Sequence, residues 1–225
     1  MKTFPVLLLA TFAASSWSPQ LASAQSAGSG DLELPELLPR DREIALARSA
    51  APPAVSQNAT VLVLERGGYV AAVGGSNGVT CYVSRSWAAA IEPHCFDREG
   101  SETILAMNLR RAELRERGES RDDIDADIAA GLADGRFRLP RRPALSWMMS
   151  ADQVLFNDDG QHVGSWKPHF MIYYPYLTED DLGLGPEPSF QAGVLVDAGK
   201  PTSNLMIVVS DFVETARTVS ASDGG

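Results

Sequence analysis

The chain has 225 residues, of which 29 are acidic and 19 are Lys or Arg, and its formal net charge at pH 7 is −10. That charge argues against binding to nucleic acid or to an anionic membrane surface, because both need a positive protein surface. After the first 24 residues, no stretch approaches the roughly 18 consecutive apolar residues of a membrane span. The length suits one domain with enough chain to bury a core.

The N-terminus has the pattern of a secretory signal peptide. Lys2 supplies a positive charge, residues 4–14 are mostly apolar, and Ala22-Ser23-Ala24 provides the small residues that a signal peptidase needs. We therefore expect cleavage of residues 1–24 after Ala24 and export to the periplasm or the exterior. The mature chain would carry −11, because the removed segment holds one lysine and no acidic residue. The alternative is an apolar anchor that stays attached.

The next residues predict a lead-in followed by strands. Residues 25–58 are expected to be flexible, with one short helix that begins at Asp41. The turn signal Asn77-Gly78 predicts a tight hairpin, so this half of the chain would form an antiparallel meander. The strands of this region are predicted at 60–64, 69–73 and 79–83.

Cys81 and Cys95 are the two cysteines of the chain. Alternation along the third predicted strand points Cys81 toward the core. In an oxidising compartment such a pair is expected to form a disulfide. The bond would close a loop of about 15 residues and stabilise the fold by roughly 3 kcal/mol. The alternatives are a thiolate metal site that uses both cysteines, and two free thiols.

Helical periodicity replaces the strand pattern over residues 101–135. One helix is predicted to end at Gly118, and a second is predicted between a cap at Ser120 and a stop at Gly135. Strand patterns return after this pair of helices. The later strands are predicted at 145–149, 154–156, 162–163, 169–176, 193–196 and 204–209.

This order of elements predicts an α+β fold. We expect a mostly antiparallel sheet, with the helical pair inserted between the N-terminal and the C-terminal strands. A single α+β domain is expected over 59–213, and a disordered tail over 214–225.

His94 and His169 are the candidates for metal binding or catalysis. Each follows a proline beside a predicted strand, so the two could meet at one end of the sheet. Imidazole is a common metal ligand and carries protons near neutral pH, and Asp97 or Glu99 would assist as a ligand, an orienting group or a base. The sequence has no H-E-x-x-H or H-x-H motif, and the alternative is that both histidines are hydrogen-bonded residues at strand ends.

Two further groups of side chains have a binding and a structural interpretation. The aromatic stretch around residues 170–176 predicts either core or the wall of a ligand pocket, because buried tyrosine hydroxyls need partners. The pocket candidates are Trp147, Met149, Tyr173 and Tyr174. A run of arginines at 136, 138, 141 and 142 would hold an anion or an acidic partner, or would balance the acidic helix before it as a solvated loop.

No motif identifies a reaction or a cofactor. We expect an exported, acidic domain that binds a small-molecule or protein partner. The alternative is a small secreted enzyme, metal-dependent or histidine-based, that uses His94 and His169.

Overall fold

The structure is a computed structural model that describes residues 35–86, 89–157, 161–185 and 190–216. The chain divides into two units, Met1–Asp31 and Leu32–Gly225, and every described residue belongs to the second. The expected signal peptide, its cleavage site after Ala24 and residues 217–225 of the expected tail lie outside the described residues. No helix in the described part of the chain combines the length and the apolar character that a membrane crossing requires.

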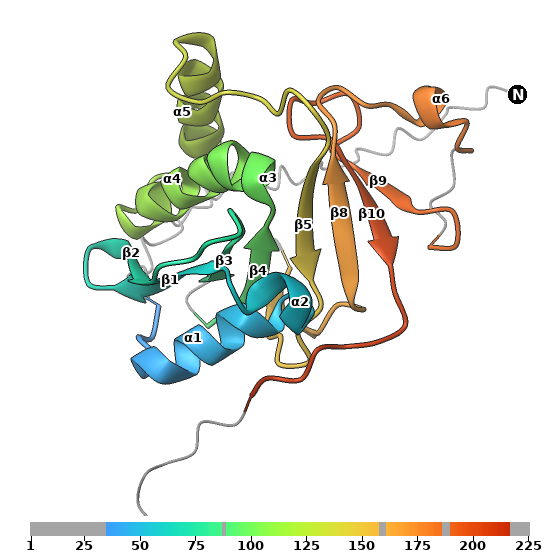
Figure 1. Cartoon of the computed structure of the whole chain (residues 1–225). Coiled ribbons are helices and arrows are strands. Elements are labelled where there is room, and N and C mark those ends of the chain that lie inside the picture. The colour runs from blue at the N-terminus through green and yellow to red at the C-terminus, as the bar shows by residue number, and fades with distance from the viewer. Residues whose placement is uncertain (1–34, 87–88, 158–160, 186–189, 217–225) are drawn as a thin grey trace, which may run out of the picture. The chain divides into compact units, whose positions relative to one another are not determined.

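The fold is built on one large sheet. Its strands are β1 (Thr60–Glu65), β2 (Gly68–Val73), β3 (Thr80–Ser84), β4 (Glu92–Phe96), β5 (Ala144–Met148), β8 (His169–Tyr173), β9 (Val194–Val196) and β10 (Asn204–Val208). They lie in the order β2-β1-β3-β4-β5-β8-β10-β9 (Figure 1). All neighbours are antiparallel except β1 and β3. A separate hairpin pairs β6 (Leu155–Phe156) with β7 (His162–Gly164).

The helices confirm the α+β class. They are α1 (Arg40–Ser49), α2 (Pro53–Ser56), α3 (Arg98–Glu102), α4 (Ile104–Glu116), α5 (Arg121–Ala133) and α6 (Glu179–Leu182). The expected helical pair corresponds to α4 and α5, and it stands between the N-terminal and C-terminal strands. The Ser120 hydroxyl caps α5 by accepting the Asp123 amide at 3.2 Å. Residues 35–58, expected as a lead-in, contain α1 and α2, and α1 packs on the sheet.

The connection from β2 to β3 differs from the expected hairpin. The antiparallel meander is wrong at this point, because β3 lies parallel to β1 instead of turning back on β2. The Asn77 amide donates to the Val55 carbonyl at 2.7 Å, and its oxygen accepts the Val79 amide at 3.0 Å. A Cβ on Gly75 would lie 2.2 Å from the Thr60 nitrogen, so the chain can cross the start of β1 only with glycine there.

The pleat of the sheet sends alternate side chains to two faces. The face that carries Cys81, Cys95 and Trp147 is called face A, and α1 covers it over β1, β3 and β4. The opposite face, face B, carries Tyr82 and Phe96 and packs against apolar side chains of α4 and α5. Each face therefore has its own hydrophobic core.

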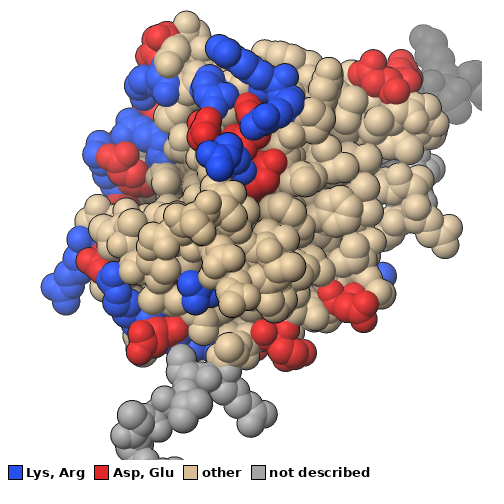
Figure 2. Space-filling view, viewed as in Figure 1, with Lys and Arg blue, Asp and Glu red and all other residues tan. Residues whose placement is uncertain are grey.

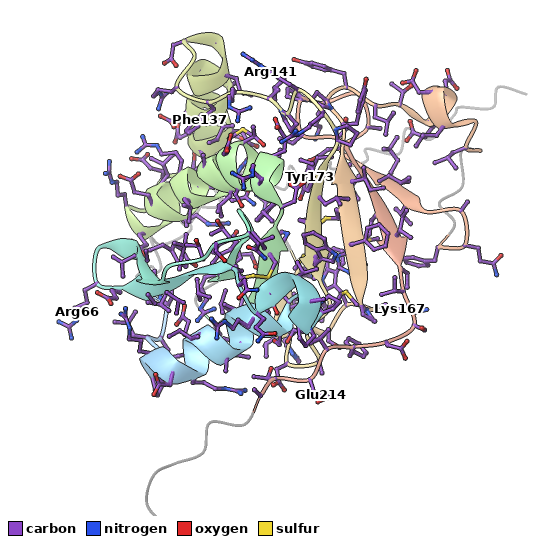
Figure 3. The ribbon with its side chains drawn as sticks, viewed as in Figure 1. Arg66, Phe137, Arg141, Lys167, Tyr173 and Glu214 are labelled. Carbon is purple, nitrogen blue, oxygen red and sulfur yellow. A yellow bond between two sulfur atoms is a disulfide. The ribbon has the colours of Figure 1, made fainter. Side chains whose placement is uncertain are left out.

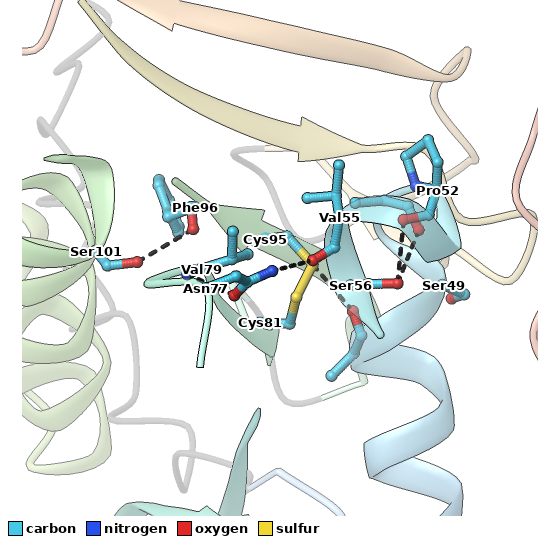
Figure 4. Close-up of a disulfide and its surroundings, with 12 residues drawn as sticks. Ser49, Pro52, Val55, Ser56, Asn77, Val79, Cys81, Cys95, Phe96 and Ser101 are labelled. Atoms are coloured by element: carbon cyan, nitrogen blue, oxygen red, sulfur yellow. Dashed lines mark hydrogen bonds between the residues drawn. A yellow bond between two sulfur atoms is a disulfide. The ribbon is translucent and has the colours of Figure 1, made fainter. Parts of the chain in front are cut away.

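The disulfide predicted from the sequence is confirmed. Cys81 and Cys95 are paired residues of β3 and β4, with their Cα atoms 4.0 Å apart, and their sulfur atoms are bonded (Figure 4). Both side chains are fully buried in the core under α1. Because both cysteines are used in the bond, a thiolate metal site is excluded.

A buried ion pair also holds α1 to the sheet. Glu43 of α1 and Arg85, which follows β3, have side chains 1% and 2% exposed, and their Oε2 and Nη2 atoms lie 3.5 Å apart. Glu43 also accepts the Leu64 amide of β1 at 3.1 Å. Burial raises the pKa of the Glu43 carboxyl, while the charge of Arg85 acts to lower that pKa. The pair therefore ties α1 to both β1 and the end of β3.

Candidate functional site

His94 and His169 lie on the same face of the sheet. His94 pairs with Tyr82 across β3 and β4, and His169 pairs with Met148 across β5 and β8. Because β5 separates their strands, the two Cα positions are about two strand spacings apart, roughly 9–10 Å. Both side chains are buried on face B.

The His94 imidazole lies in an aromatic stack. Its ring centroid is 4.2 Å from that of Phe96 and 6.0 Å from that of Tyr82. Burial lowers the pKa of His94 to about 3, and the nearby His169 adds to that effect. Its Nε2 atom has no hydrogen-bond partner among the described residues. At neutral pH the ring is therefore uncharged.

The second imidazole is oriented by the backbone. His169 Nδ1 donates to the Lys167 carbonyl at 2.7 Å, and the Trp166 ring centroid lies 5.6 Å from the imidazole centroid. Burial lowers the pKa of His169 as well. Its Nε2 atom, like that of His94, has no partner in the described part of the chain.

The two candidate carboxylates are engaged elsewhere. Asp97 caps α3 by accepting the Gly100 amide at 2.7 Å. The Glu99 side chain points toward the arginine run, and its Oε1 accepts a hydrogen bond from Arg138 Nη1 at 3.1 Å. Within the described ranges, no group of three or more His, Cys, Asp or Glu side chains is arranged to hold a metal ion. The structure thus brings the histidines to one face and directs both acids to other roles.

The four pocket candidates divide between the two faces. Trp147 of β5 lies on face A. Met149 and Tyr174 directly follow the last residues of β5 and β8, and continued alternation would direct their side chains to face A as well. Tyr173 points to face B, where it is buried (Figure 3). Its hydroxyl donates to Met171 Sδ at 3.6 Å, and burial raises the pKa of Tyr173. Tyr173 is thus part of the covered core, whereas the other three lie on a different surface.

Among the described residues, no helix covers face A over the C-terminal strands. Strand register places apolar side chains in two rows across β5, β8, β10 and β9. These seven residues, here named the open face, are Leu145, Ile172, Leu205 and Leu195 in one row, and Trp147, Phe170 and Ile207 in the next. All seven are only partly buried, and none is charged.

The helix of face A does not extend over these rows. The main contacts of α1 are with β1, β3 and β4, and β8, β10 and β9 have no helix in front of them in Figure 1. Figure 2, viewed from the same side, shows a broad expanse without charged side chains over this part of the sheet. Trp147 joins the two regions, because it also packs against the core under α1.

Searches of protein-family models, curated proteins and solved structures found no match to this chain. The function is therefore inferred from the geometry of the described residues. The sequence predicts Trp147 and the stretch 170–176, which contains Ile172, as core or pocket wall, but it does not point to Leu205, which stands beside Ile172 in the open face. Only the register of β8 with its neighbours reveals those rows.

Proposed function

We propose that this chain is an exported, acidic partner-binding domain whose open face receives an amphipathic helix of another protein. The supporting observation is a continuous group of seven partly exposed apolar side chains, with no charge among them, on a chain of net charge −10. Contiguous exposed apolar surface commonly marks a site of protein interaction. Export rests on the sequence of residues 1–24, and the buried disulfide is consistent with an oxidising compartment.

The chain already packs one helix on this face. Leu46, Ala47 and Ala50 are buried where α1 meets β1, β3 and β4. The open face continues the same surface from Trp147 onto β8 and β10. A helix beside α1 would extend an existing layer of the fold, which is the usual way to bury an apolar sheet face. Its apolar stripe would lie on the two rows of the open face.

The size and charge of the open face describe the partner further. Four strands at a spacing of about 4.8 Å span roughly 14–20 Å including the outer side chains. A helix of about 10–13 residues covers that distance. The net charge of −10 attracts a cationic chain at long range, so the polar side of the partner helix is expected to carry Lys or Arg.

The first test uses a synthetic amphipathic helix of leucine and lysine, about 14 residues long, titrated calorimetrically into the mature protein. Ile172→Asp places a charge in the centre of the open face, and Val163→Asp places the same charge on an exposed site of β7 outside it. We expect Ile172→Asp to weaken binding by about tenfold or more and Val163→Asp to leave it unchanged. Ile172→Ser gives the same comparison if the aspartate variant unfolds.

Other occupants would give different results. Equal binding by both aspartate variants, or no saturable binding, would contradict the proposed function. Sedimentation shows whether the protein dimerises in a way that Ile172→Asp abolishes. That outcome would keep the open face as an interface and replace the partner helix with a second copy of the chain.

One observation favours the alternative of a histidine-based enzyme, namely that Nε2 of His94 and Nε2 of His169 each lack a partner among the residues that the structure describes. The separation of their strands and the engagement of Asp97 and Glu99 at other positions weigh against it. Binding through the open face therefore remains the better proposal.

A further inference from the structure

Three arginines gather around one buried carboxylate, that of Glu99 on α3. Arg138 Nη1 donates to Glu99 Oε1 at 3.1 Å, and the backbone amide of Arg141 donates to the same oxygen at 3.0 Å. Arg142 Nε lies 3.2 Å from Glu99 Oε2. The Glu99 side chain is 8% exposed, so the acid forms the floor of this group.

The backbone fixes the position of Glu99. The Asp97 side chain caps α3, and the Asp97 amide donates to the Leu145 carbonyl of β5 at 2.9 Å. The Thr103 hydroxyl donates to the Glu99 carbonyl at 2.5 Å. Because α3 is tied to both β4 and β5, the backbone that carries the Glu99 side chain is held in place.

Glu99 stays ionised in this setting. The backbone N–H of Arg141 lowers the pKa of its carboxyl most, and Arg138 and Arg142 lower that pKa further. Both carboxylate oxygens are engaged by these groups. Glu99 therefore anchors the segment that leads into β5 and directs its arginines around one point.

An open hollow lies at that point. Its volume is about 520 Å³, and it is lined by Glu99, Arg138, Arg141 and Arg142. This volume is within the range of small-molecule sites. Figure 2 shows basic side chains gathered here with a few acidic ones near α3, and Arg141 is labelled in Figure 3 on the segment between α5 and β5.

Two of the arginines retain free donors. Both terminal nitrogens of Arg138 are engaged, because Nη1 donates to Glu99 and Nη2 donates to Glu102 at 2.5 Å. Arg142 uses Nε for Glu99, and within the described part of the chain its terminal nitrogens have no acceptor. The Arg141 guanidinium forms no ion pair with any residue that the structure describes. With Glu99 and Glu102 counted, the group carries one positive charge on a chain of net charge −10.

We infer that this hollow binds the phosphoryl group of a small molecule between Arg141 and Arg142. The guanidinium fork pairs with two oxygens at once, and a phosphoryl group offers three oxygens to two such forks. A carboxylate has only two oxygens, which a single fork satisfies. The site is separate from the open face and does not depend on the proposed function.

The test follows the arginine Nε–Hε signals of ¹⁵N-labelled mature protein by NMR during titration with inorganic phosphate, at constant ionic strength. We expect saturable shifts at Arg142, with a dissociation constant in the millimolar range. Arg141→Gln and Arg142→Gln should each weaken binding by about tenfold. The control is Arg136→Gln, because Arg136 belongs to the same basic run but pairs with Asp127 and Asp134.

Three results would overturn the inference. Shifts that rise linearly without saturation would show only general attraction of anions. An Arg136→Gln variant that loses as much affinity as the other two would assign the effect to net charge. Acetate that binds as tightly as phosphate would replace the phosphoryl group with a carboxylate. Because Arg142 is 64% exposed at its side chain, its substitution leaves the folded core intact and the titration can be read.

Discussion

The two halves of the sheet differ in how completely they are covered. In β1, β3 and β4 the side chains of face A lie under α1, and Val61 and Val83 are fully buried. In β5, β8 and β10 only face B is closed, with Met171 and Met206 buried against the helical layer. The disulfide and the buried ion pair both belong to the first half.

This difference in coverage assigns stability mainly to one half of the sheet and binding mainly to the other. The covered half contains a complete core on each face, so it holds the chain together without help from a partner. The open face leaves apolar area in water, and a partner that removes this area gains roughly 25 cal/mol for each Å² buried. The C-terminal half is therefore where binding gains most, and changes there should affect affinity more than folding.

The sharpest test compares the same substitution in each half. Phe96 on β4 is fully buried, whereas Phe170 on β8 is a partly exposed member of the open face. We expect Phe96→Ala to lower the free energy of unfolding by about 3–5 kcal/mol, because it leaves a cavity in the core of face B. Phe170→Ala should cost roughly 1–1.5 kcal/mol, since water already reaches its ring. Urea unfolding measures both, and equal losses would contradict the division of the sheet.

Removal of the disulfide tests the covered half alone. The double variant Cys81→Ala with Cys95→Ala should lower the free energy of unfolding by about 3 kcal/mol, the value for a loop of this length. Binding of the leucine–lysine helix should stay unchanged well below the melting temperature, because the bond lies outside the open face. Calorimetry on the same sample checks both values. A loss of affinity in the folded variant would mean that the two halves are coupled.

Local signals in the sequence predicted most elements of the fold. The Ser120 cap and the alternation in β5 act over a few residues, so they can be read without knowledge of the fold. The parallel alignment of β3 with β1 depends on the passage of Gly75 past Thr60, a contact between distant segments that no local pattern records. A strand was expected beside His94, but the bounds of β4 were not predicted, since Pro93 lacks the amide donor that a strand normally uses.

The candidate sites, like the fold, could be predicted from the sequence only where a local pattern determines them. Tyr173 and Tyr174 are neighbours in an extended segment, so alternation alone requires them to point to opposite faces. The convergence of Arg138 and Arg142 on Glu99 could not be predicted, because α4 and α5 separate them in sequence and Glu99 had been assigned to the histidines.

The smallest change expected between successive measurements, one pH unit apart, concerns His94, which lies where the two halves of the sheet meet on face B. Its pKa is about 3 in the folded chain and 6.5 ordinarily, so as the pH falls the unfolded chain takes up the proton first. The stability due to the neutral ring is complete above pH 6.5 and is lost progressively between pH 6.5 and pH 3. The loss is about 1.4 kcal/mol for each pH unit.

The variant His94→Phe removes this titration and keeps an aromatic ring beside Tyr82 and Phe96. We expect urea unfolding at pH 7, 6, 5 and 4 to show that the free energy of unfolding of the variant rises relative to that of the wild type. Below pH 6 the rise should be about 1.4 kcal/mol for each pH unit. The difference between the two proteins reports His94 together with its coupling to His169, because the raised pKa values of Glu43 and Glu92 act equally in both. The exposed His162 on β7 serves as the control, and His162→Phe should follow the wild type at every pH. Parallel curves for His94→Phe and wild type would show that the imidazole is protonated in the folded chain, and that water reaches face B between the two halves.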